Sequence, residues 1–250
     1  MWHSWSGPEA HIALEALAYL VGASIYWRQA SREPKPHFEH RVLLLGGAVL
    51  GAVLGSKLLH VMEHLPTLLA RNELALWVGG KSVLGGFLGG TLGVELIKKF
   101  IRWTRPTGDP WVAALAVGLI VGRIGCQLSG TWDQTYGTPT VLPWAWDYGD
   151  GVGRHPAAIY EIFLVAGAFL ATGLPSLRRH PGARFATFLL AYCAMRFGLE
   201  WLKPPFGGSA EGSLPVALYS GLTAIQWTAL AGITWYVGLL RLRLRSPAVS

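Results

Sequence analysis

Long apolar runs separated by short polar connections dominate the chain. Seven of these runs come close to the roughly 20 residues that a membrane-spanning helix needs, the third being short and rich in glycine. The pattern therefore predicts an all-α, polytopic membrane protein of about seven transmembrane helices, built as a single domain over residues 1–250. The runs are 11–28, 41–62, 82–98, 109–130, 156–175, 183–202 and 216–240.

Composition agrees with a membrane setting. Of the 250 residues 52% are hydrophobic and only 14% are charged, and the mean hydropathy is +0.37. The 12 Trp residues suit membrane interfaces, and the 32 Gly residues allow helices to approach closely. The two cysteines, Cys126 and Cys193, lie in apolar runs and are expected to be free thiols.

The net charge of +7 is explained by topology and requires no nucleic-acid partner. Most of the 21 Lys and Arg residues fall on alternate connections between the runs, which by the positive-inside rule are cytoplasmic. The N-terminus is then expected outside and the C-terminus inside. These basic residues are Arg28, Arg32, Lys35, Arg41, Lys98, Lys99, Arg102, Arg105, Arg178, Arg179, Arg184, Arg241, Arg243 and Arg245.

Two connections on the opposite side are long and patterned. Residues 63–80 form an amphipathic stretch that can lie along the interface. Residues 131–155 are rich in Trp, Tyr, Gly and Pro, and a loop of that length is more often functional than idle. Both are predicted to be outward-facing segments.

Glycine recurs every four residues in three of the runs. In a membrane such ridges of small residues mark close helix contacts, so they are interpreted as scaffold. The ridges are Gly47, Gly51 and Gly55; Gly85, Gly89 and Gly93; and Gly118 and Gly122.

Charged residues also occur inside the runs, where an arginine costs about 2.5–3.5 kcal/mol even on a lenient insertion scale. Arg123 lies three residues before Cys126, and Tyr192, Arg196 and Glu200 share one helical face at i, i+4 and i+8. Two interpretations stay open. Arg196 and Glu200 form a structural ion pair, or the two arginines bind an anionic phosphate, for which guanidinium geometry is suited.

The segment "RHPAAIYE" (154–161) begins another helix near Pro156. His155 at this boundary is more often a hydrogen-bonding residue than a base, and Tyr160 and Glu161 follow in the second turn. No HExxH or CxxC spacing occurs, so no metal site is expected.

Five blocks in order resemble the bacterial prolipoprotein diacylglyceryl transferase family. They are "GGKSVLGGFLGG" (79–90); "GRIGCQLSG" followed by "YGTPTVLPWAW"; "RHPAAIYE"; "YCAMRFGLEWLKPP"; and "GLTAIQW". Together they span about 79–227 on a matching seven-helix pattern.

The resemblance implies transfer of the diacylglyceryl group of phosphatidylglycerol to the lipobox cysteine thiol of a preprolipoprotein. Glycerol phosphate leaves, a thioether forms, and no cofactor takes part. It implies a monomer in the bacterial cytoplasmic membrane, with catalytic residues Arg123, Arg196, Glu200 and Tyr192. The implied substrate-binding residues are Lys57, Gly122, Cys126, Gly137, His155, Tyr160, Glu161 and Gln226.

The chain departs from the family pattern at several positions. Leu84 stands where the family has a histidine regarded as a candidate base, and Glu15 and Ala16 replace a Tyr and a Gly. Thr131 replaces a Glu, and Ala158 a Gln. The base is then dispensable, is replaced by Glu15 or His155, or is lost in a divergent relative.

Two other classes of function are weighed against the transferase. One is a relative that binds lipid or lipoprotein without transfer. The other is a transporter or channel, which would line a path across the whole bilayer with charge. For that class Lys57, Glu15 and Glu95 are the residues to explain, and Glu15 is the hypothetical partner of Lys57.

Overall fold

The computed structural model describes residues 7–31, 37–71, 73–132, 134–204, 206–207 and 214–245. Within these ranges most of the chain is helical, and four helical segments are long and apolar enough to cross a membrane: Pro8–Ala30, Phe38–Arg71, Trp111–Leu128 and Ala183–Leu202. The longer helices are α1 (Pro8–Ala30), α2 (Phe38–Arg71), α4 (Val83–Phe100), α5 (Trp111–Leu128), α6 (Ala157–Ala171), α8 (Ala183–Leu199) and α9 (Ala224–Arg245).

Short elements connect the longer helices. Two are the helical turns α3 (Leu74–Gly79) and α7 (Pro175–Arg178), and a turn of 3-10 helix, Glu200–Leu202, extends α8. The others are paired strands, so the all-α prediction is correct for the bulk of the fold but omits three small ribbons. Their strands are β1 (Trp146–Asp147) with β2 (Gly153–Arg154), β3 (Phe206–Gly207) with β4 (Leu214–Pro215), and β5 (Leu218–Tyr219) with β6 (Leu222–Thr223).

Each of the seven predicted apolar runs overlaps one longer helix, but the second run ends too early. α2 continues through Pro66, which lacks an N–H and leaves the carbonyl four residues earlier without its helical donor. The hydroxyl of Tyr219 donates to that carbonyl, on Met62, at 2.6 Å. The next carbonyl, on Glu63, accepts from the Ala217 N–H at 2.7 Å. These contacts from a distant segment allow the helix to pass a proline.

The seventh predicted run starts too early, because its first residues form the β5–β6 hairpin rather than helix. Ser220 and Gly221 make the turn with φ of 51° and 83°. Such a turn matches the twist of two-residue hairpins. Thr223 then caps α9: its hydroxyl accepts from the Gln226 N–H at 3.1 Å, and the Gln226 side chain accepts from the Thr223 N–H at 3.0 Å. This reciprocal capping box places the helix start.

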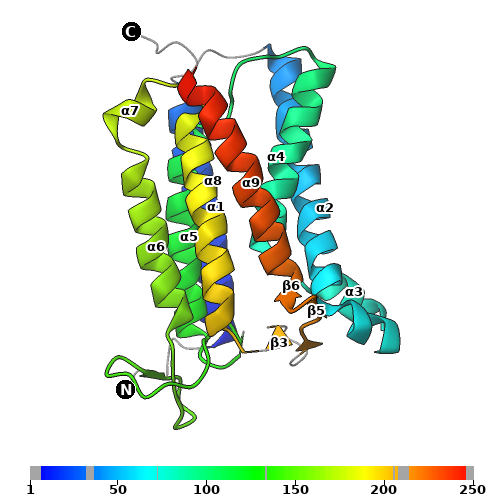
Figure 1. The fold of residues 1–250 in the computed structure, drawn as a ribbon, viewed down its shortest axis with the longest axis vertical. Helices are drawn as coiled ribbons and strands as arrows, with labels where there is room; N and C mark the ends of the chain where they lie inside the picture. The colour runs from blue at the N-terminus through cyan, green and yellow to red at the C-terminus, as the bar shows by residue number, and fades with distance from the viewer. Residues whose placement is uncertain are drawn as a thin grey trace.

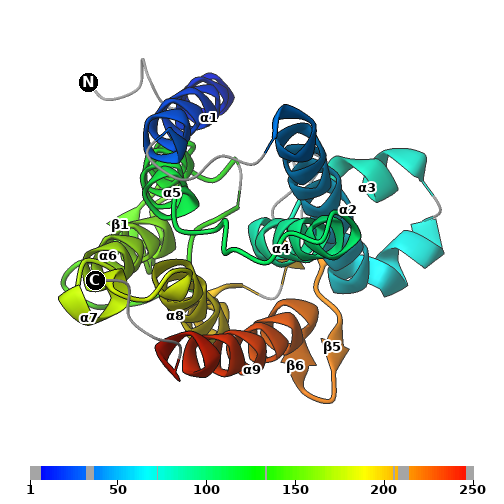
Figure 2. The same ribbon diagram turned by 90° about the horizontal axis from the view of Figure 1, so that it is seen from above.

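The longer helices form two groups, and the pair α8 and α9 connects them. α1, α5 and α6 lie side by side in one group, and α2 packs along α4 in the other. α8 and α9 connect them, since α8 contacts α6 and α9 contacts both α2 and α4 (Figure 2). The C-terminal end of α9 and the ribbons β3, β5 and β6 lie at opposite ends of the molecule (Figure 1).

Glycines set the distance between α2 and α4. A Cβ atom on Gly51 would overlap the Gly89 carbonyl, and one on Gly55 would overlap the Gly85 carbonyl. The two predicted ridges therefore face each other and let the backbones touch. The third ridge fits less fully: Gly118 approaches the Ala18 carbonyl of α1, with a Cβ position 3.5 Å away, whereas Gly122 has nothing within 4 Å.

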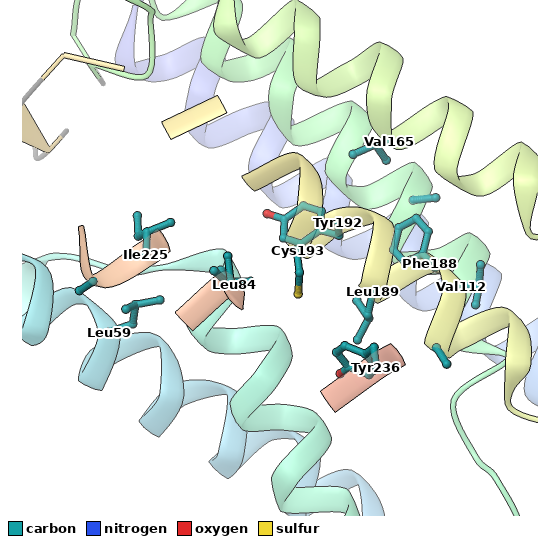
Figure 3. Packing of buried hydrophobic residues seen from close by; sticks show 14 residues of the cluster. Leu59, Leu84, Val112, Val165, Phe188, Leu189, Tyr192, Cys193, Ile225 and Tyr236 are labelled. Carbon is teal, nitrogen blue, oxygen red and sulfur yellow. The ribbon is translucent and has the colours of Figure 1, made fainter. Parts of the chain in front are cut away.

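The largest apolar core surrounds α8. Phe188, Leu189 and Cys193 are almost completely buried there, and Tyr236 of α9 closes the far side (Figure 3). Leu84 of α4 belongs to the same core. Cys126 and Cys193 are both buried, and neither is in a disulfide, as the sequence predicts.

Replacing Gly89 by alanine should destabilise the α2–α4 contact, because the added methyl group meets backbone that cannot rotate away. We expect a loss of about 1–3 kcal/mol, measured as a lower unfolding temperature in detergent. Gly86→Ala on the same helix is the matched control, since its Cβ would lie 3.7 Å from the nearest atom. Equal destabilisation by both changes would contradict the close-packing account.

Candidate active site

One buried carboxylate joins three helices near the ends that face the ribbons. Glu161 of α6 is 2% exposed, and its Oε2 lies 2.5 Å from the Nε of Arg123 on α5. Its Oε1 accepts from Nη1 of Arg196 on α8 at 2.8 Å. Carboxylate and guanidinium are each costly to bury alone, so the three groups neutralise one another. This contact answers why an apolar chain tolerates Arg123.

A second carboxylate extends the chain of charges. Nη2 of Arg196 donates to Glu200 at 3.2 Å, so the structural ion pair suggested by their i, i+4 spacing is present. The hydroxyl of Thr223 lies 3.5 Å from the other oxygen of Glu200. Three helices and the start of α9 thus meet at one ionic cluster, defined here as Arg123, Glu161, Arg196 and Glu200.

Two further charged residues border the ionic cluster, and sequence reasoning missed both. Nζ of Lys203 lies 4.0 Å from Glu161, and burial together with the charge of Arg196 lowers the pKa of that amine. Glu63 of α2 interacts electrostatically with Glu200 and Lys203. Lys203 stands three residues after Glu200 in the "EWLKPP" segment, a spacing that could have indicated it. Glu63 had no such signal, because its proximity arises from tertiary packing.

The arginines retain capacity for another anion. Each guanidinium carries five N–H donors, and the contacts above use only part of them. Arg123 is the more accessible of the two, with 13% of its side chain exposed against 6% for Arg196. Its Nη1 also lies 3.5 Å from the sulfur of Cys126, so that predicted residue is brought to the site.

Tyr192 lies on α8 one helical turn before Arg196, within the apolar core beside the ionic cluster. Its ring packs against Phe87 at 5.0 Å within the apolar core. Its hydroxyl is buried without a hydrogen-bond partner among the described residues. Within the described residues Tyr192 therefore makes no hydrogen bond to Arg196, and its catalytic role stays a prediction.

His155, Tyr160 and Gly137 form a neighbouring contact at the start of α6. Nδ1 of His155 lies 3.1 Å from the Tyr160 hydroxyl, which also accepts from Nε1 of Trp144 at 2.7 Å. Gly137 donates its N–H to the His155 carbonyl, and a Cβ there would lie 2.5 Å from the His155 Cβ. These contacts fasten the 134–155 loop over the helix end. His155 is thus a hydrogen-bonding residue in this structure.

Two predicted substrate-binding residues, Lys57 and Gln226, have structural partners elsewhere, and a third, Gly122, has no close neighbour. Lys57 donates to the carbonyls of Val78 and Gly80, at 2.7 Å to the latter, and so ties α2 to the end of α3. Gln226 completes the capping box of α9. Gly122 lies on α5, one residue before Arg123, without a close neighbour.

The hypothetical pairing of Glu15 with Lys57 is wrong. Glu15 accepts from Lys81 and from Tyr19 instead. Because Lys81 lies two residues before the start of α4 and Glu15 lies on α1, this ion pair links the two helix groups. Within the described part of the chain, no three His, Cys, Asp or Glu side chains come together as metal ligands.

Apolar helices surrounding a buried ionic cluster define a helical membrane protein with a polar site between its helices. The family model for prolipoprotein diacylglyceryl transferase matches residues 10–242 of this chain. The chain belongs to that family of transferases.

Relatives from several bacteria support the assignment over nearly the whole length. A phosphatidylglycerol–prolipoprotein diacylglyceryl transferase of Bordetella parapertussis is 31% identical over 247 residues, covering 93% of this chain and 91% of the relative. Proteins of the same name from Nitrosomonas europaea and from Wolbachia pipientis of Culex pipiens are 32% and 29% identical. The two alignments cover 90% and 94% of this chain, and 83% and 93% of the respective relatives.

Replacing Glu161 by glutamine should strongly destabilise the protein. The change keeps the side-chain volume but leaves the guanidinium groups of Arg123 and Arg196 without their shared counter-charge. Breaking a buried ion pair from one side costs about 3–5 kcal/mol, which chemical unfolding in detergent would measure.

The exposed pair of Asp150 and Arg154, 2.7 Å apart, provides the control. Asp150→Asn should leave stability unchanged within error, because exposed pairs contribute little. The double variant Glu161→Gln/Arg123→Gln should recover part of the loss by removing one unpaired cation. Absence of any such recovery would show that Glu161 does not act through its charge.

Proposed function

We propose that this protein transfers the diacylglyceryl group of phosphatidylglycerol to the lipobox cysteine thiol of a preprolipoprotein. The sulfur forms a bond to the glyceryl carbon as that carbon's bond to the phosphate oxygen breaks. Glycerol phosphate leaves with the electron pair, and the thiol proton passes to a base. The single observation that carries the proposal is the pair of guanidinium groups held together on Glu161.

The geometry suits this reaction because negative charge develops on the departing phosphate. Fixed cations placed where charge develops accelerate such steps without reorganising. Glu161 fixes the two cations, and Glu200 restrains Arg196 from the other side. Arg123, more exposed than Arg196, is the better placed to contact the phosphate, and Lys203 at the rim adds positive charge.

The remaining predicted residues are assigned to shaping the site and to controlling access to it. Cys126 and Gly122 lie on α5 around Arg123, and Tyr192 lies one helical turn before Arg196 on α8. His155, Tyr160 and Gly137 hold the loop that covers this end of the molecule. Lys57 and Gln226 act at a distance: Lys57 holds the end of α3, and Gln226 fixes the start of α9. No metal or cofactor is needed for the step.

The proposed setting is the bacterial cytoplasmic membrane, crossed about seven times by a monomer. Basic residues on alternate connections support an outer N-terminus and a cytoplasmic C-terminus. In that orientation the ionic cluster and the segments 63–80 and 131–155 face outward. A lipoprotein precursor presents its cysteine on that side.

Removing the cation at Arg123 should abolish most transfer while preserving the fold, because Glu161 keeps its contact with Arg196. We expect Arg123→Ala to lower the rate about 10²–10³-fold, the usual cost of deleting one charge-stabilising donor. Arg123→Lys should recover only part of it, since bidentate geometry is lost. The measurement is mass-spectrometric detection of a diacylglyceryl adduct on a synthetic lipobox peptide incubated with phosphatidylglycerol.

Arg179→Gln, at the exposed C-terminal end of α7, is the matched control and should retain full turnover. Full turnover by Arg123→Ala would remove Arg123 from the mechanism. The same result together with an inactive Arg196→Ala would place the phosphate on Arg196 alone.

The leucine at position 84 provides a separate test of the base. Leu84 is 2% exposed in the core, where a histidine would bury an imidazole without an assigned partner. We expect the wild type to form the adduct, and Leu84→His to unfold at a lower temperature without a higher rate. Both are read in the same peptide assay with a parallel thermal melt.

Two outcomes would alter the proposal. An adduct from Leu84→His alone would indicate a divergent relative that kept the site and lost the standard chemistry. No adduct from either protein, beside an active control transferase, would favour lipid or lipoprotein binding without transfer.

A further inference from the structure

A second polar site lies at the opposite end of the helices from the ionic cluster. A pocket of about 300 Å³ opens between the C-terminal ends of α4 and α9. α9 has 22 residues and therefore separates this pocket from the Glu200 end by about 30 Å. Figure 1 shows both helix ends on the side away from the ribbons. The residues of the pocket that matter here are Glu95, Lys98, Lys99, Arg102, Trp103 and Arg243.

Positive charge in this pocket exceeds its internal counter-charge. Lys98 is buried, and Glu95 neutralises it at 2.8 Å. Lys99, Arg102 and Arg243 line the same pocket, and none of them has an ion-pair partner among the described residues. Basic residues at helix C-termini also offset the helix dipole, but that effect requires neither a concavity nor convergence from two helices. Three convergent cations in a hollow are the arrangement that an anion stabilises.

The backbone holds one of these cations in an unusual conformation. Arg102 has a φ of 55°, and the turn is closed by hydrogen bonds from its N–H to Lys99 at 3.3 Å and from the Trp103 N–H to Lys98 at 2.8 Å. Glycine usually occupies this position after a helix, because a side chain there is strained. The arginine is therefore placed at the pocket at a conformational cost.

The pocket adjoins a surface suited to hydrocarbon. Leu92, Leu96 and Phe100 follow one another at intervals of four on α4 and are 52%, 61% and 79% exposed. Leu96 lies three residues before Lys99, so the apolar strip reaches the rim of the pocket. A ligand with a phosphate at one end and an acyl chain at the other fits a basic pocket that adjoins an apolar strip.

We propose that the pocket binds the phosphate of an anionic phospholipid from the leaflet at that end of the molecule. Lys99, Arg102 and Arg243 contact the phosphate, and the exposed strip of α4 contacts an acyl chain. In the topology proposed above this is the cytoplasmic leaflet, so the lipid is distinct from the one consumed at the ionic cluster. Basic pockets between transmembrane helices on that side are suited to acidic headgroups.

Photolabelling with peptide mapping tests the site directly, since it separates the two ends of the molecule. The full chain in detergent is labelled with a phosphatidylglycerol that carries a diazirine on an acyl chain, and the labelled peptides are identified. We expect label on the segment 90–105, removed by competing unlabelled phosphatidylglycerol but not by phosphatidylcholine or inorganic phosphate. The triple variant Lys99→Gln/Arg102→Gly/Arg243→Gln should weaken this labelling about 100-fold.

The control variant Arg179→Gln/Arg241→Gln/Arg245→Gln removes the same charge from exposed positions at the same end, and should retain the label. Arg102→Gly alone keeps the test independent of folding, because glycine relieves the strained turn. It should unfold no earlier than the wild type and still weaken labelling about fivefold. Equal losses of labelling in the pocket and control triple variants would show that general surface charge, rather than this pocket, attracts the lipid. Competition by inorganic phosphate would overturn the lipid assignment, and label insensitive to every pocket change would overturn the site.

Discussion

The fold depends on a buried carboxylate whose charge must be neutralised by neighbouring cations. Glu161 is buried between two guanidinium groups that come from different helices, and each of the three would be unfavourable in an apolar bundle without the others. Because water does not compete at this position, the contact fixes the relative rotation of α5, α6 and α8. The helices are then positioned by their charges as well as by their apolar faces.

That arrangement also connects stability with chemistry. A cation that is to stabilise a developing phosphate charge must already be oriented before the substrate arrives. Otherwise the free energy needed to reorient it offsets the stabilisation. Glu161 orients both arginines in advance, and Glu200 and Thr223 extend the restraint to α9. The same contacts that stabilise the empty site therefore set the geometry in which a lipid phosphate would be received.

Helix content, the number of apolar runs and the Arg196–Glu200 pair could be predicted because each depends on local spacing. The role of Glu161 as the shared partner could not, since it arises from three helices that meet only in the tertiary fold. Likewise, Lys57 and Gln226 carry motif positions, yet their contacts are with backbone carbonyls and a helix cap. Motif resemblance proposes which residues matter and leaves open what each one touches.

Pro66 has a consequence for how the chain is made. The carbonyl it deprives of a partner, on Met62, accepts its hydrogen bond from Tyr219, which lies 157 residues further along. If helices enter the bilayer in the order of synthesis, α2 is inserted long before Tyr219 leaves the ribosome. The hydrogen bonding of α2 around Pro66 is then completed only after translation is nearly finished, so the N-terminal half reaches its final structure only once the C-terminal half is in place.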